Sequence, residues 1–63
     1  MQDYQQRVVD EKTALDEKIS KLRVFIDSEI HQNLPEKERI RLGRQLFHMR
    51  RYSEILGERI DAF

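Results

Sequence analysis

Two stripes of apolar residues with helical spacing, separated by one proline-bearing segment, constrain what this 63-residue chain can fold into. In both, steps of three and four residues alternate, which is the spacing of a seam between packed helices. The seam positions are Val8, Leu15, Ile19, Leu22 and Ile26 in the first stripe and Leu42, Leu46, Met49, Leu56 and Ile60 in the second, which Phe63 ends. The pattern predicts an all-α fold.

Each stripe has one polar interruption, Lys12 in the first and Ser53 in the second. If the chain turns back on itself, Lys12 falls beside Ser53 while apolar residues meet apolar residues in the other layers. This coincidence predicts an antiparallel two-helix hairpin, in which Lys12 either fixes the register by pairing with Ser53 and Glu54 or extends its ammonium to solvent. One domain, residues 1–63, is expected, with helices over about 3–29 and 35–61 and a turn over about 30–34.

The turn itself contains two residues with local preferences. Asn33 tolerates left-handed geometry, which suits the end of a helix. Pro35 is expected in the first turn of the second helix, where its missing N–H costs nothing.

The apolar residues outside the seam favour self-association. A domain this small buries only about 60% of its unfolded surface, and the chain has no Cys to staple it. Two helices that touch along one line cannot bury these residues, so we expect a homodimer packed as a four-helix bundle. The alternative is a monomer with scattered exposed apolar residues. The expected oligomer or partner interface comprises Phe25, Ile40, Gly43, Phe47, Tyr52 and Ile55.

The two glycines, Gly43 and Gly57, lie two heptads apart and share one side of the second helix. Each costs roughly 1 kcal/mol relative to alanine inside a helix. Close approach of another helix or a ligand would explain a glycine here, and a packing role is favoured for Gly43, whereas Gly57, near the end of the helix, is expected to have none.

Composition excludes several functions. Twelve basic and twelve acidic side chains balance, so no net charge attracts nucleic acid or membrane, and no apolar run is long enough to span a bilayer. No nucleophile lies beside a histidine at helical spacing, no metal-ligand cluster is visible and no cofactor motif occurs. A non-enzymatic protein of the cytoplasm is expected.

A basic run in the second helix is the strongest sign of a ligand. Six Lys and Arg residues and one acid, Glu38, lie between residues 37 and 51. Arg44, Arg50 and Arg51 are candidate anion contacts, and Tyr52 could stack on a base. The favoured alternative is salt bridging, both between protomers to the acidic first helix and within the second helix, for example between Arg50 and Glu54, because these arginines do not share one face.

The stretches Tyr4–Lys12 and Met49–Ile60 resemble small helical-hairpin proteins of tailed phages, in particular the small open reading frame of the lambdoid exo–xis region. This resemblance implies an accessory protein of the host cytoplasm that binds a host protein and favours lytic development. The chain more loosely resembles the hairpin of phage anti-CBASS and anti-Thoeris sponges, which implies sequestration of cyclic nucleotide signals. The preferred function is host-protein binding, with the sponge first and nucleic-acid binding second as alternatives.

Overall fold

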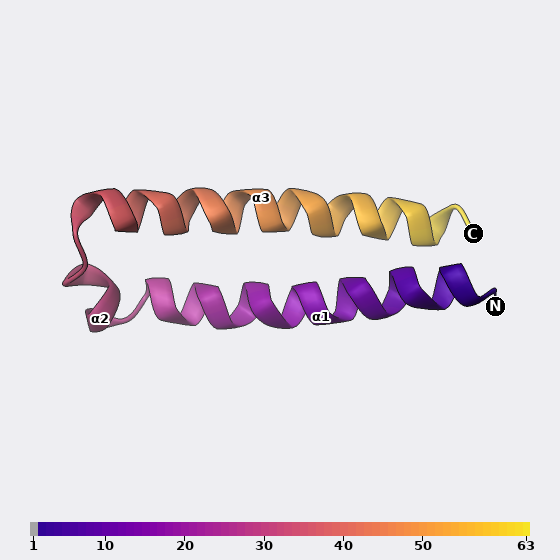
Figure 1. Cartoon of the computed structure of the whole chain (residues 1–63), viewed down its shortest axis with the longest axis horizontal. Helices are drawn as coiled ribbons and strands as arrows, with labels where there is room; N and C mark the ends of the chain where they lie inside the picture. The colour runs from indigo at the N-terminus through magenta and orange to yellow at the C-terminus, as the bar shows by residue number, and fades with distance from the viewer. Residues whose placement is uncertain (1) are drawn as a thin grey trace.

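The computed structural model describes residues 2–63 and has two long helices that pack side by side in opposite directions (Figure 1). Helix α1 spans Asp3–Ile26, the short helix α2 spans Glu29–Gln32, and α3 spans Glu36–Asp61. Both ends of the chain lie at the same end of an elongated molecule measuring 46 × 14 × 13 Å. The prediction of an all-α antiparallel hairpin is confirmed.

The connection differs from the predicted one because the first helix ends at Ile26 rather than near residue 29. The Ser28 hydroxyl donates to the carbonyl of Phe25 at 2.6 Å and accepts from the N–H of His31 at 3.4 Å. A serine side chain that bonds its neighbouring backbone in this way competes with the helical ladder. It therefore ends α1 and caps α2, which occupies most of the predicted turn.

Two further expectations for the turn differ from what is seen. Asn33 has φ −89°, so the chain leaves α2 without a left-handed residue. Pro35 stands one position before α3 as its N-cap, and its carbonyl accepts from the N–H groups of Glu38 and Arg39. The proline ring still fixes φ where the helix begins, which is the physical basis of the prediction.

Burial along the seam is concentrated near the chain ends. Val8, Ser53 and Leu56 are buried, and Leu56 is fully so. The rings of Tyr4 and Phe63 pack edge to face at that end of the hairpin, with their centres 5.9 Å apart. The remaining seam residues are only half-buried: Leu15, Ile19, Leu22, Ile26, Leu42, Leu46, Met49 and Ile60. In the half of the hairpin nearer the turn, no described seam residue is fully buried.

A polar layer joins the two helices near Val8 and Leu56. The Lys12 ammonium donates to Asp16 Oδ2 at 2.8 Å and to Ser53 Oγ at 3.0 Å. The Ser53 hydroxyl in turn donates to Asp16 Oδ1 at 2.5 Å. The predicted pairing of Lys12 with Ser53 is confirmed. The predicted pairing of Lys12 with Glu54 is wrong, since Glu54 accepts from Arg51 at 3.3 Å.

The two glycines have different surroundings from those expected. A Cβ at Gly43 would meet nothing within 4 Å, whereas one at Gly57 would lie 3.4 Å from Lys12 Cε. Within one hairpin, it is Gly57 that has a close neighbour, because the Lys12 side chain crosses it to reach Ser53. Gly43 faces open space.

We expect Gly43→Ala to raise the free energy of unfolding by about 0.5–1 kcal/mol, since alanine restricts the unfolded chain and meets no obstacle here. Gly57→Ala is the matched control and should gain less, because its Cβ would press on Lys12. Urea unfolding followed by circular dichroism measures both. A Gly43→Ala variant less stable than the wild type would mean that another helix packs against this position in solution.

Candidate functional site

One side of the hairpin combines basic and aromatic side chains from both long helices. On α1, steps of four and three residues define a stripe beside the seam. Its members are Arg7, Glu11, Ala14, Lys18, Lys21 and Phe25. The equivalent stripe on α3 consists of Glu38, Arg41, Gln45, His48, Tyr52, Ile55 and Arg59.

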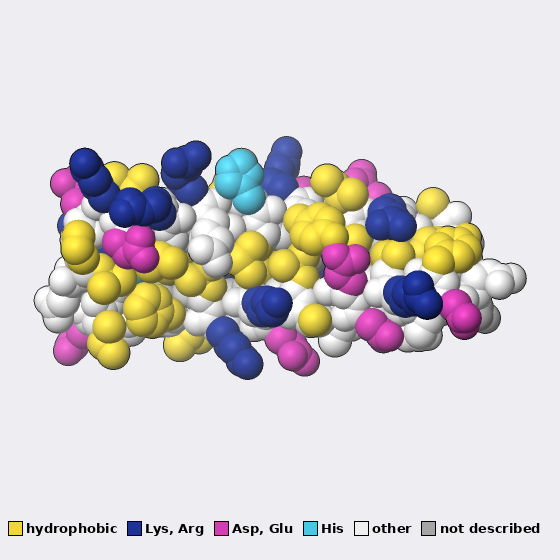
Figure 2. All heavy atoms as spheres, in the orientation of Figure 1, with side chains coloured by type: hydrophobic (Ala, Val, Ile, Leu, Met, Phe, Trp, Pro, Cys, Tyr) yellow, Lys and Arg dark blue, Asp and Glu magenta, His cyan; other side chains and the backbone are white. Residues whose placement is uncertain are grey.

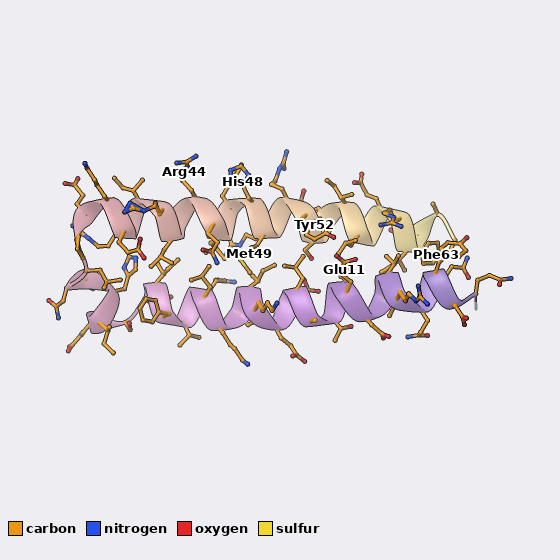
Figure 3. All side chains as sticks on the ribbon, viewed as in Figure 1. Glu11, Arg44, His48, Met49, Tyr52 and Phe63 are labelled. Carbon is orange, nitrogen blue, oxygen red and sulfur yellow. The ribbon has the colours of Figure 1, made fainter. Side chains whose placement is uncertain are left out.

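The Tyr52 hydroxyl shows that the two stripes border the same side of the seam, because it donates to Glu11 Oε2 on α1. This bond raises the pKa of the Tyr52 phenol above its usual value, since the phenolate would face the Glu11 carboxylate. Arg59 acts on the same phenol in the opposite direction through its positive charge. Figure 3 shows Tyr52 and Glu11 reaching toward one another across the gap between the helices.

We call this side the basic face, because its two stripes hold five Lys or Arg residues and two acids. Both acids are already bonded, Glu11 to the Tyr52 hydroxyl and Glu38 to Arg41. In the described part of the chain, Arg41 is the one cation of the face with an ion pair, to Glu38 at 3.3 Å. Figure 2 shows this face, with dark blue side chains along both edges of a band of yellow apolar ones. Phosphate groups are the ligands that such a set of guanidinium and ammonium groups binds best.

The aromatic members of the face have different surroundings. Phe25 is half-buried, and its ring packs edge to face with that of His31, with the ring centres 6.1 Å apart. Tyr52 remains 43% exposed in spite of its bond to Glu11. Aromatic rings beside cations are the groups on which nucleotide bases stack.

The residues predicted as an oligomer or partner interface lie on more than one side of the hairpin. Ile40 and Phe47 are 54% and 58% exposed and lie on the side of α3 away from α1, whereas Tyr52 lies on the basic face. Ile55 is half exposed and lies on the α3 stripe of the basic face. No single flat partner could cover all six predicted residues.

The predicted anion contacts are also divided. Arg44 and Arg51 are one heptad apart on the side of α3 away from α1, and Arg50 lies on the side of the hairpin opposite the basic face. The expected pair between Arg50 and Glu54 is wrong, since Glu54 bonds Arg51 instead. The cations of α1, above all Lys18 and Lys21, were missed, because they join the others only when the hairpin closes.

The described residues hold no group of three or more His, Asp or Glu side chains that could bind a metal ion. An open surface depression lies away from the basic face, near the C-terminal end of α1. It is lined by Ser20, Arg23, Val24 and Asp27. In residues 2–63 no helix is long and apolar enough to cross a bilayer.

The fold and this face define a small all-α hairpin with an exposed cationic and aromatic surface. A comparison with protein families places the chain more closely, since the Sequestin family model matches residues 2–62. The chain therefore belongs to the Sequestin family. No curated protein and no solved structure matches it.

Proposed function

We propose that this protein is a non-enzymatic sequestering protein that binds a small phosphate-bearing signal, of the cyclic-nucleotide class, at the basic face. The family name denotes sequestration, and the family model covers almost the whole chain. The single observation that carries the choice of ligand is the excess of five cations over two already bonded acids on the two stripes. Sequestration requires binding without a reaction. The Lys, Arg and aromatic side chains of this face are groups that bind a ligand.

The proposal includes an origin and a setting. The resemblance to small phage proteins supports a phage accessory protein that acts in the host cytoplasm by removing a host defence signal. Self-association is part of the same proposal, because the exposed apolar side chains outside the seam leave surface that a second hairpin would cover. A ligand bound at the basic face would be withdrawn from its receptor.

The test is a thermal-shift and calorimetric titration with a cyclic dinucleotide, cyclic di-AMP first. A ligand at 100 times its dissociation constant should add about 2.7 kcal/mol to the free energy of unfolding. Adenosine, which has no phosphate, is the control ligand and should give no shift. A flat response to every cyclic dinucleotide would contradict the proposal.

Charge reversal on α1 locates the site. We expect the Lys18→Glu/Lys21→Glu variant to lose at least about tenfold in affinity, since two attractive phosphate contacts become repulsive. Lys37→Glu carries the same kind of charge change on another side of the protein and serves as the matched control. If Arg44→Glu removes binding and the Lys18→Glu/Lys21→Glu variant does not, the ligand lies on the side of α3 away from α1.

A host protein is the second candidate partner, favoured by the exposed apolar side chains of Ile40, Phe47 and Ile55. Protein partners commonly bury a few large apolar side chains against an exposed apolar surface of this kind. Phe47→Ala should then abolish capture of a defined host protein while leaving cyclic dinucleotide binding unchanged. Nucleic acid is distinguished from both by an affinity that falls steeply with salt concentration.

A further inference from the structure

A second stripe of residues follows α3 on the side that faces away from α1. Its positions alternate by three and four residues, as those of the seam do, but are offset from the seam positions by about two residues. This offset places them on the side of the helix opposite the seam. We call it the outer stripe, and its members are Lys37, Ile40, Arg44, Phe47, Arg51, Glu54, Glu58 and Asp61. Figure 3 shows one of them, Arg44, pointing away from α1.

The outer stripe has an exposed apolar centre. Phe47 and Ile40 are more than half exposed. The Arg51 guanidinium lies over the Phe47 ring, 5.9 Å from its centre, and also bonds Glu54 at 3.3 Å. Phe47 is thus held by a neighbouring cation while most of its ring remains available for contact.

Charge along the outer stripe is divided by sign. All its cations lie in the first two thirds, at Lys37, Arg44 and Arg51, and all its acids in the last third, at Glu54, Glu58 and Asp61. A parallel copy would place like charges opposite one another, which is unfavourable. An antiparallel copy would place each charged end opposite the end of other sign.

We infer that a second copy of this chain packs on the outer stripe, with the two α3 helices antiparallel about a two-fold axis near Met49. Opposed heptad positions then form four layers, each present twice by symmetry. These layers pair Lys37 with Asp61, Arg44 with Glu54, Arg51 with Phe47 and Ile40 with Glu58 of the second copy. Three of the four layers are thereby complementary, two as ion pairs and one as a cation over an aromatic ring.

This contact gives the helix order α1–α3–α3–α1 across the dimer, instead of the bundle in which two hairpins stack over their seams. The basic face of each copy stays uncovered in this arrangement. The inference therefore stands apart from the proposed ligand, and self-association is expected in the absence of any nucleotide.

Charge exchange between two variants tests the pairing of Arg44 with Glu54. Arg44→Glu and Glu54→Arg, each alone, should self-associate about tenfold more weakly than the wild type in sedimentation equilibrium at low salt, since each variant places like charges opposite one another. An equimolar mixture of the two should recover wild-type affinity, because both layers then hold opposite charges. Lys18→Glu, on the basic face, is the control and should associate like the wild type.

Both substituted side chains are exposed, so circular dichroism should show the wild-type helix content in each variant. A wild-type protein that sediments as a monomer at every concentration up to the millimolar range overturns the inference. So does an Arg44→Glu variant that associates like the wild type, or a mixture that stays as weak as its components. Each of these outcomes leaves the cyclic dinucleotide titration unaffected, which keeps the two proposals separable.

Discussion

Leu56→Ala is expected to unfold most of the protein at room temperature. Leu56 is the one fully buried large side chain among the described residues, and it lies in the same part of the seam as the buried residues Val8 and Ser53. Removing a buried leucine side chain costs about 2–5 kcal/mol. A core of this size rarely supplies more than about 3–5 kcal/mol in total, so the loss is comparable with the whole free energy of unfolding.

The neighbouring position provides a matched control for this prediction. Ile55 is 52% exposed, so Ile55→Ala removes a side chain of the same size with little burial to lose and should shift stability by under about 1 kcal/mol. Circular dichroism during heating reports both variants. Equal melting temperatures for Leu56→Ala and the wild type would mean that this part of the seam is not where the stability of the hairpin lies.

Asp16→Asn is expected to lower the free energy of unfolding by about 1 kcal/mol at neutral pH. Its carboxylate accepts from the Lys12 ammonium at 2.8 Å and from the Ser53 hydroxyl at 2.5 Å. Hydrogen bonds to charged groups are worth about 1.5–3 kcal/mol, and solvent reduces this value because the Asp16 side chain is 47% exposed. Glu17→Gln removes one negative charge from an exposed neighbour and should change little.

The effect of Asp16→Asn should also depend on pH in a known direction. The Lys12 hydrogen bond, followed by that of Ser53, lowers the pKa of Asp16 below its ordinary value of 3.8, against a smaller effect of burial. A carboxyl whose pKa is lower in the folded state stabilises the fold above its unfolded pKa. That stabilisation disappears as the pH falls through the folded pKa, so the two proteins should converge in strongly acidic solution. Urea unfolding at pH 7 and below pH 3 measures the difference, and a gap that persists in acid would contradict this account.

The architecture was predictable from the sequence because it depends on periodicity alone. Two stripes of period 3.5 with one proline between them favour a hairpin, and the matched interruptions at Lys12 and Ser53 select one register. Their bond at 3.0 Å confirms that register. Asp16 was not predicted as a member of the layer, although its position four residues after Lys12 on the same helix was a usable signal.

Local side-chain chemistry explains why the first helix ends early. Nothing in the apolar pattern marks its end, since Ile26 is a seam position and Ile30 continues the spacing. The Ser28 hydroxyl donates to the Phe25 carbonyl and accepts from the His31 N–H, and the first helix ends before it. A serine next to an aspartate after a long helix is a recognisable capping signal.

What the sequence by itself determined is the class of fold, its register and the residues that form the seam, because helical periodicity is a local property of the chain. The tertiary structure alone decided which seam residues are fully enclosed and which cations share a face. Lys18 and Lys21 come to border the same surface as Arg41 and Arg59 only when residues twenty or more positions apart are folded back against one another. A linear charge run selects neighbours in sequence, whereas a ligand meets the charges that are neighbours in space.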